Sequence, residues 1–232
     1  MKSIAKQTQY LIIALVFMGL QSCIKSGDDY YPMAIGTVQI ETGDVNTLYF
    51  DLDSGYKLFP KNPEDIVVND LKTNDRVFIQ YTDPDEDSSK KELTAKIKML
   101  LQVDTGDIEF TEDDNSAQSL IEASAPINIT EAYIANGFLT LKYSYLGKLN
   151  ASDHNIELYA TKDNPSNDGK TLKLYLTHDA KEDNNTYINN GIISFPISEI
   201  NDQVEVAEKV TIMSKTIYSG LQEAPVYINK QK

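Results

Sequence analysis

The chain of 232 residues is predicted to be an all-β protein with two domains, a small barrel followed by a β-sandwich. Three observations favour this fold class. Short runs of alternating apolar and polar residues recur along the chain, turn-forming residues separate these runs, and no long stretch has helical spacing. Hydrophobic residues make up 41% of the chain, which is enough for cores of this size.

The first segment, residues 1–22, has the pattern of an export signal. Lys2 and Lys6 precede the apolar run Leu11 to Leu20, which would rise only about 15 Å as a helix and is too short to span a bilayer. Cys23 is the only cysteine, and its place just after this run resembles the lipobox of bacterial lipoproteins. That resemblance implies cleavage before Cys23 and lipid attachment to it, which would hold the chain at a membrane. The alternatives for Cys23 are an unpaired thiol and an ordinary buried residue.

Residues 23–32 are predicted to be a tether, because Gly27 and Pro32 disfavour regular structure. The adjacent acids Asp28 and Asp29 resemble the surface-export signal of Bacteroidetes lipoproteins, and a solvated linker is the other interpretation. We therefore expect a protein anchored by lipid in the outer membrane or cell envelope, on its periplasmic or its outer surface.

Residues 33–103 are predicted to form the barrel. Gly43-Asp44 and Asp53-Ser-Gly55 supply turns, Pro60 ends a strand, and Asp83 to Asp87 reads as an acidic loop. Five short strands in so few residues suit a small barrel. The predicted strands cover residues 34–41, 47–53, 56–59, 76–82 and 94–103.

Residues 104–126 are acidic and then small and polar, so we expect a passage between two domains. Residues 127–232 are predicted to be a β-sandwich. Asn136-Gly137 is a strong hairpin signal, and alternating apolar residues follow it. The further predicted strands include residues 128–134, 139–145, 156–158, 172–176, 192–195 and 210–218.

The charge of the chain limits its partners. The formal net charge is −14, with −5 in residues 33–103 and −10 in residues 104–232. An anionic surface of this kind repels phosphate backbones, so no nucleic-acid partner is expected. Neutral or cationic ligands remain, such as a protein or a neutral glycan.

Over both of its halves, the chain resembles the NigD-like lipoproteins of Bacteroidetes. The resemblance rests on Leu20 to Cys23, Leu48 to Pro60, Leu71 to Tyr81 and Asn136 to Tyr145. It implies an N-terminal OB-type domain and a C-terminal β-sandwich behind a lipoprotein signal. The family name comes from an association with a bacteriocin locus, and the resemblance implies no catalytic residues and no cofactor.

No catalytic residues are predicted from the side chains. The two histidines, His154 and His178, match no zinc spacing and no nucleophile motif, so we expect them to be solvated loop residues at strand ends. No metal site is predicted. Calcium binding by an acidic loop stays open, and the acids concerned are Asp104, Asp107, Glu109, Glu112, Asp113 and Asp114.

Four tyrosines are predicted to bind a ligand. If Leu158 and Leu174 face the core, then Tyr159 and Tyr175 lie on the opposite face of their strands. Exposed tyrosines there would stack on a sugar or a protein, and scattered surface tyrosines are the simpler explanation. On the barrel, Tyr49 and Tyr56 lie where OB-type barrels bind oligomers.

The sequence therefore predicts a lipid-anchored, non-enzymatic binding or interaction module of the cell envelope, with the ligand surface chiefly on the second domain. Two alternatives stay open. One is an immunity-type or structural envelope protein linked to bacteriocin systems. The other is an envelope hydrolase, which would need His154 or His178 in a cleft with carboxylates.

Overall fold

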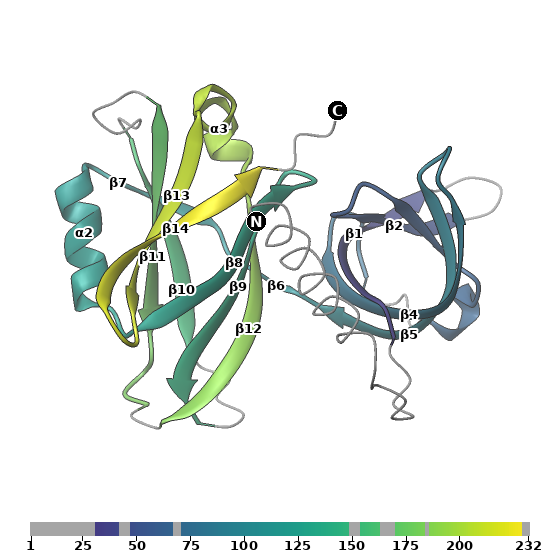
Figure 1. The fold of residues 1–232 in the computed structure, drawn as a ribbon, viewed down its shortest axis with the longest axis horizontal. Coiled ribbons are helices and arrows are strands. Elements are labelled where there is room, and N and C mark those ends of the chain that lie inside the picture. Colours follow the sequence, from purple (N-terminus) through teal and green to yellow (C-terminus); the bar gives the residue numbers. More distant parts are fainter. Residues whose placement is uncertain are drawn as a thin grey trace, which may run out of the picture. The chain divides into compact units, whose positions relative to one another are not determined.

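The structure is a computed structural model that describes residues 31–41, 47–66, 71–148, 154–162, 170–183 and 186–228. The predicted signal peptide and Cys23 lie outside the described residues. The elements below belong to one compact unit, Pro32–Lys232. Its described part confirms the all-β prediction, with a barrel followed by a large sheet (Figure 1). Within the described residues, no helix is both long and apolar enough to span a membrane.

The barrel closes in the strand order β1-β2-β3-β5-β4, and β4 pairs back onto β1. Alternate residues point inward, so Val38, Phe50, Leu58, Val77 and Ile79 are fully buried at its centre. Its elements are β1 (Met33–Glu41), β2 (Thr47–Leu52), β3 (Lys57–Pro60), the 3-10 turn η2 (Pro63–Asp65), β4 (Arg76–Asp87) and β5 (Glu92–Gln102).

The predicted acidic loop in the barrel is wrong, because β4 continues as a strand to Asp87 and pairs with β5. The register shifts twice along this pair, which lets acidic residues stay in the ladder at its outer end. Two contacts fix this end to β3 and the residues beside it. The Tyr56 hydroxyl donates to Glu86 at 2.7 Å, and Lys61 Nζ lies 2.5 Å from Asp85.

The second domain is a nine-stranded sheet in the order β6-β12-β9-β8-β14-β13-β11-β10-β7. Its core side chains come from the inward positions of all its longer strands, among them Leu139, Leu141, Leu158, Leu174 and Phe195. Its elements are β6 (Asp104–Thr105), β7 (Ile108–Thr111), α2 (Asp114–Ala123), β8 (Ile127–Ala135), β9 (Phe138–Gly147), β10 (Asn155–Thr161), β11 (Thr171–Asp179), β12 (Tyr187–Pro196), η4 (Ser198–Ile200), α3 (Asn201–Val206), β13 (Lys209–Thr216) and β14 (Gly220–Ile228).

The predicted hairpin joins β8 and β9. Asn136 and Gly137 have φ values of 50° and 77°, the left-handed conformation that a two-residue turn requires at both central positions. The paired strands on either side begin at Ala135 and Phe138. This local signal therefore sets the register of the two strands from the turn to Glu131, and the register shifts between Glu131 and Ile129.

Residues 104–111 join the two edges of this sheet. β6 pairs in parallel with β12 at one edge, and β7 pairs in parallel with β10 at the other. One short segment thus draws the edge strands toward each other and closes the curled sheet around its core. The expected polar passage over residues 104–126 is instead structured, with two strands and a helix that belong to the sandwich.

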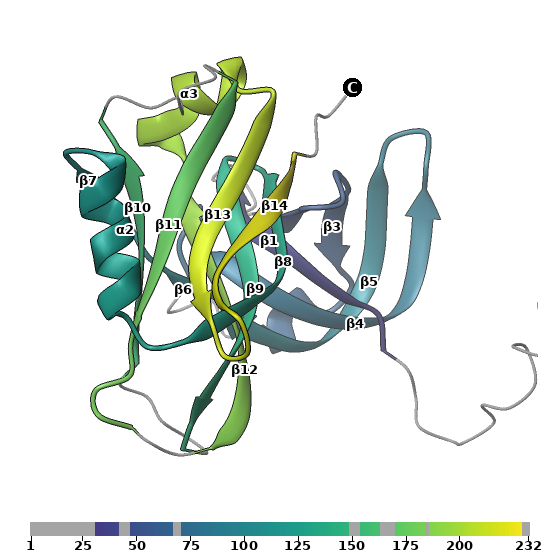
Figure 2. The same ribbon diagram turned by 60° about the vertical axis from the view of Figure 1, so that its left-hand side comes forward.

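Helix α2 covers the outer face of β10 and β11 (Figures 1 and 2). It begins where the Asp113 side chain accepts a hydrogen bond from the Ser116 amide at 2.8 Å, which satisfies one of the free amides of the first turn. Ala117 and Ile121 lie four residues apart on its buried face and pack against Tyr175. A second small core therefore lies on the outer side of the sheet.

Candidate functional site

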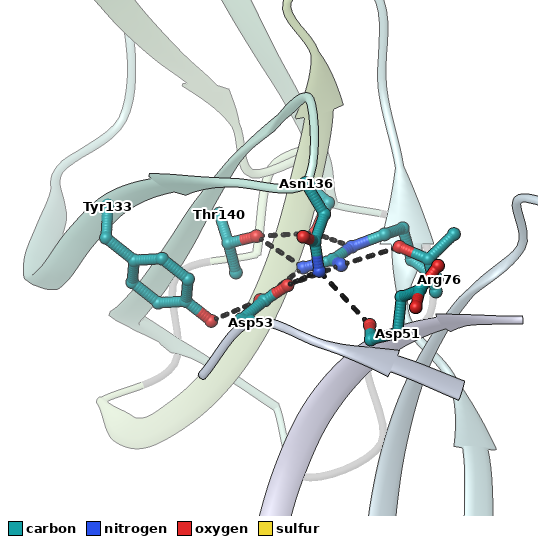
Figure 3. Close-up of polar contacts among 8 residues, drawn as sticks. Asp51, Asp53, Arg76, Tyr133, Asn136 and Thr140 are labelled. Atoms are coloured by element: carbon teal, nitrogen blue, oxygen red, sulfur yellow. Dashed lines mark hydrogen bonds and ion pairs between the residues drawn. The ribbon is translucent and has the colours of Figure 1, made fainter. Parts of the chain in front are cut away.

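A buried ion pair joins the barrel to the sandwich (Figure 3). The Arg76 guanidinium is fully buried and contacts both carboxylate oxygens of Asp53, at 2.8 and 2.6 Å. Its remaining donors reach hydroxyls of both domains, Thr37 at 3.0 Å in the barrel and Thr140 at 2.9 Å and Ser194 at 3.3 Å in the sandwich. We call these residues, with Tyr133 and Asn136, the Arg76 network.

Two further residues of the sandwich complete the network around the Asp53 carboxylate. Tyr133 donates its hydroxyl at 2.9 Å, and Asn136 donates its amide at 3.3 Å and also reaches the Asp51 carbonyl at 3.1 Å (Figure 3). Burial and the adjacent carboxylate raise the pKa of Tyr133, which keeps its hydroxyl a donor. The charged groups of Arg76 and Asp53 thus both form hydrogen bonds with side chains of the barrel and of the sandwich. The network therefore links the two domains.

A cavity of about 520 Å³ lies in the second domain where α2 ends beside β10 and β11. Leu120 and Tyr159 supply apolar surface to its lining, and charged groups of both signs surround them. Lys215 also lines it and donates its ammonium to the carbonyls of Glu122 and Ser124, at 2.9 Å each, near the carboxyl end of α2. The other charged residues of the lining are Glu157, Asp179, Lys181 and Glu182.

The expectation that Tyr175 is exposed is wrong. Tyr175 lies on the face of β11 opposite Leu174, as the alternation requires, but its side chain is only 4% exposed because α2 covers it. Burial and a hydrogen bond to Asp114 raise its pKa. Tyr175 is therefore a core residue and offers no surface to a ligand.

Tyr159 is half-buried beside the same small core and lines the cavity. Its hydroxyl donates to Glu157 at 2.7 Å, and burial together with this bond raises its pKa to about 12. A ligand role for Tyr159 stays a prediction.

The barrel tyrosines are held by neighbouring side chains. Tyr49 is 8% exposed, packs against Phe59 at 5.4 Å between ring centroids, and donates to Glu41 at 3.1 Å. The ammonium of Lys57 lies 4.8 Å from the centre of the Tyr49 ring. The burial of Tyr49 contradicts an open stacking surface at this position, while a ligand role for the half-buried Tyr56 stays a prediction.

The two histidines are not solvated loop residues, which corrects that prediction. His178 is 1% exposed and the His154 side chain 5% exposed, and the two rings stack with centroids 5.0 Å apart. Tyr145 packs on both rings, at 4.5 Å from His154 and 5.2 Å from His178. We call His154 and His178 the histidine pair.

Hydrogen bonds occupy every ring nitrogen of the histidine pair. His154 Nδ1 lies 2.7 Å from His178 Nε2, His154 Nε2 lies 3.4 Å from Asp183 Oδ2, and His178 Nδ1 lies 3.1 Å from the Pro126 carbonyl. Burial is the main cause that lowers the pKa of His178, and the adjacent His154 adds to it. A histidine acting as a catalytic base needs a ring nitrogen that faces the substrate, and here each nitrogen faces another group of the protein.

The sequence contained a signal for the histidine pair. His178 continues the period-two series Leu172, Leu174 and Leu176, all of which face the core. His154 has the same parity as Leu158 on the neighbouring strand. Extending each strand by one alternation would have placed both histidines inside the sandwich.

Three of the six acids considered for calcium have structural partners, among them Asp114, which bonds Tyr175. Asp113 caps α2, and Glu112 pairs with Lys162 at 2.5 Å on the surface. Within the described parts of the chain, no three histidine, cysteine or acidic side chains converge as metal ligands would.

Comparisons with known proteins identify both domains. The NigD-like N-terminal OB domain matches residues 35–103, and the NigD-like C-terminal beta sandwich domain matches residues 107–228. No curated protein matches the chain.

Three solved structures share the fold. A protein of unknown function from Bacteroides vulgatus is 15% identical with a TM-score of 0.64, and the match covers 84% of this chain and 90% of that one. A predicted lipoprotein from Bacteroides fragilis is 14% identical with a TM-score of 0.62, over 87% and 100% of the two chains. A NigD-like immunity protein from Bacteroides caccae is 19% identical with a TM-score of 0.56, over 84% and 93%. The chain belongs to the NigD-like family, with an N-terminal OB domain and a C-terminal β-sandwich domain.

Proposed function

We propose that the chain is a lipid-anchored protein of the cell envelope that acts as a non-enzymatic interaction module, with its binding site on the β-sandwich. The observation that carries this proposal is the cavity of about 520 Å³ between α2 and the strands β10 and β11. It combines apolar surface from Leu120 and Tyr159 with charged groups of both signs, the mixture by which a site holds a ligand and fixes its orientation.

The barrel acts as a spacer between the lipid and this site. The predicted anchor, Cys23, precedes the barrel in the chain, and the Arg76 network bonds the barrel to the sandwich. A buried, hydrogen-bonded ion pair of this kind resists separation, because either charge left alone in the interior would be strongly unfavourable. The network therefore supports a role in which the sandwich is held at a set position relative to the barrel.

The ligand is expected to be neutral or cationic. Residues 104–232 carry a net charge of −10, so the field around the sandwich disfavours anionic polymers. The cavity itself offers the carboxylates of Glu157, Asp179 and Glu182 beside a single tyrosine ring. A protein segment with neutral or basic side chains fits this lining, and a neutral glycan is the other outcome that a test can return.

Metabolic labelling tests the anchor. Cells that express the chain and are fed a labelled fatty acid should incorporate it into the wild-type protein, and Cys23→Ala should stay unlabelled and leave the membrane fraction. Ser22→Ala, which leaves the cysteine in place, is the matched control and should label normally. Equal labelling of wild type and Cys23→Ala would contradict lipid attachment at this residue.

Cross-linking tests the site. A photoreactive amino acid at Leu120, which lines the cavity, should capture a specific partner from intact envelopes. The same group at Tyr218, which is 78% exposed and does not line the cavity, is the control and should not capture that partner. Capture of one partner from both positions, or none from Leu120 after verified expression, would count against the cavity as the binding site.

An immunity-type role is the second candidate, and it is favoured by a specific finding. One solved structure of the same fold, from Bacteroides caccae, is called a NigD-like immunity protein. For this chain the role predicts that deleting its gene makes cells sensitive to a toxin or bacteriocin, and that the cavity variants lose protection without losing membrane attachment. Unchanged sensitivity of the deletion strain would leave the interaction module as the sole proposal.

A hydrolase is not supported by the geometry of the histidine pair. Both ring nitrogens of each histidine are bonded within the protein, so catalysis would first require the pair to separate. His154→Gln, at a residue that does not line the cavity, would abolish a hydrolytic activity and would leave partner capture at Leu120 intact, and this difference separates the two functions.

A further inference from the structure

The histidine pair is the centre of a hydrogen-bonded chain that runs through the end of the sandwich. The Pro126 carbonyl, between α2 and β8, lies at one end of this chain, and the Asp183 carboxylate, in the turn after β11, lies at the other. The two imidazole rings connect them through a nitrogen-to-nitrogen distance of 2.7 Å. The two rings and the Asp183 carboxylate are buried or nearly so, whereas Pro126 is an exposed residue.

The hydrogen-bonding groups at the two ends determine how many protons the rings must hold. A carbonyl oxygen only accepts, so His178 Nδ1 must carry a proton to bond Pro126. An ionised carboxylate also only accepts, so His154 Nε2 must carry a proton to bond Asp183. The two nitrogens that face each other need one more proton between them. The chain of bonds is complete with three protons, whereas two neutral imidazoles hold only two.

We infer that His154 and His178 act as one titrating unit, which holds three protons and a single positive charge at neutral pH and is forced apart when it takes up a fourth at mildly acidic pH. With three protons, the central hydrogen bond exists and the charge is balanced by Asp183. With four protons, two N–H groups face each other across the same short distance and two positive charges stack. The pair is therefore stable in one protonation state and strained in the next.

The groups around the histidine pair fit this charge. Asp183 accepts hydrogen bonds from His154 and, at 2.6 Å, from the Lys148 amide. Burial raises the pKa of the adjacent Tyr145, which keeps that ring neutral.

The other nearby groups do not bring a charge into contact with the rings. Asp179, at the end of β11, forms an ion pair with Lys181 on the exposed side of the strand. From the α2–β8 connection, Ala125 and Pro126 contribute only backbone groups. Among the described neighbours, Asp183 is thus the one ionised group in contact with the pair.

The close packing transmits any separation of the rings to the wall of the cavity. A Cβ atom on Gly147 would lie 3.0 Å from His154 and 3.2 Å from Asp183, so the backbone of Gly147 packs closely against the pair on that side. His178 and the turn from Asp179 to Glu182 line the cavity, and the Ala125 amide bonds the His178 carbonyl at 2.8 Å. Opening of the pair would therefore loosen this wall, and this holds whether or not the cavity binds a ligand.

Nitrogen NMR counts the protons directly. The chain has only two histidines, so a spectrum of the protein labelled with nitrogen-15 on histidine contains four ring signals. At pH 7 we expect the two outer nitrogens to have protonated shifts, and the two central nitrogens to hold one proton between them, seen either as one protonated and one unprotonated shift or as two averaged shifts. Two nitrogens with fully unprotonated shifts at pH 7 would overturn the inference.

A conservative variant checks the reason for the third proton. Asp183→Asn replaces the carboxylate with an amide that can donate to His154 Nε2, so the pair should fall to two protons at pH 7. Asp179→Asn removes the other acid near the pair, which does not bond either ring, and should leave three. The same proton count in wild type and Asp183→Asn would contradict the assignment.

Hydrogen exchange tests the opening. On lowering the pH from 7 to 5, the protection factors of the Ala125 and Lys148 amides should fall roughly tenfold or more, because both amides bond residues of the opened cluster. The Val38 amide in the barrel, bonded to the Asp75 carbonyl, is the control and should keep its protection. Equal changes at all three amides would indicate general unfolding and would contradict a local device.

Discussion

The Arg76 network and the histidine pair bury cations in two places, one between the barrel and the sandwich and one at an end of the sandwich. Arg76 keeps its proton at every physiological pH, and its donors are matched by the Asp53 carboxylate and by hydroxyls. The face of Phe138, 4.9 Å from the guanidinium carbon, adds a favourable contact. The histidines hold a charge that can change near neutral pH. A buried permanent charge gives a contact whose strength does not depend on pH. A buried titratable charge gives a contact whose strength does.

The largest effect is expected from breaking the Arg76 network. Arg76→Ala leaves Asp53 buried without its partner, which should cost about 3–5 kcal/mol of the free energy of unfolding. Urea denaturation measures this loss. The double variant Arg76→Met with Asp53→Leu removes both charges and should recover a large part of it. A loss below about 1 kcal/mol for Arg76→Ala would show that the network contributes little to stability.

Removal of Tyr175 should cost slightly less, about 3 kcal/mol, because it opens the small core under α2. Tyr175→Phe keeps the ring and loses only the hydrogen bond to Asp114, so its cost should be about 1 kcal/mol. Thermal and urea unfolding of both variants check these values. If Tyr175→Ala were neutral, the ring would lie on an open surface, and the stacking role predicted from the sequence would stand again.

The histidine pair should make stability depend on pH. Burial lowers the pKa of His178 in the folded protein, whereas in the unfolded chain it titrates near its ordinary value of about 6.5. Below that pH the unfolded state binds more protons, so the stabilising contribution is present above about pH 6.5 and is lost as the pH falls. Urea denaturation at pH 7 and pH 5 should show this loss in the wild type, smaller than the cost of Tyr175→Ala.

His178→Gln is the matched variant for the pH series, since it cannot take up a proton. The difference in unfolding free energy between pH 7 and pH 5 should be smaller in this variant than in the wild type. The double variant Arg76→Met with Asp53→Leu, which leaves no unpaired buried charge, should keep the wild-type difference. An identical pH dependence in wild type and His178→Gln would assign the effect to carboxylates elsewhere.

The smallest effect is expected for a charge pair on the surface. Glu112 and Lys162 lie 2.5 Å apart but are 81% and 55% exposed in their side chains. Glu112→Gln should change the unfolding free energy by less than about 1 kcal/mol, and added salt should reduce even that change. If Glu112→Gln lowered the unfolding free energy as much as Arg76→Ala, burial would not explain the difference between the two ion pairs.

The sequence alone determined the alternation of each strand, the hairpin at Asn136 and Gly137, and thereby the two all-β domains. The sequence also contains signals for helix α2. Helix α2 was missed although Asp113 is a good capping residue and Ala117 and Ile121 have helical spacing. Its ten residues lie in a stretch whose acidic and polar composition is typical of a linker, so composition and spacing indicate different structures there.

Only the tertiary structure decided what covers the outer faces of the strands. Arg76, Thr140 and Ser194 all occupy outward positions by alternation, as does Tyr175, and all four are buried. The first three are covered where barrel and sandwich meet, and Tyr175 is covered by α2. Side-chain parity follows from the geometry of a single strand, so it can be read from neighbouring residues. Whether the outer face of a strand is buried depends on segments that lie far away in the chain, as with Arg76 and Ser194. The residues next to either position therefore contain no pattern that predicts their contact.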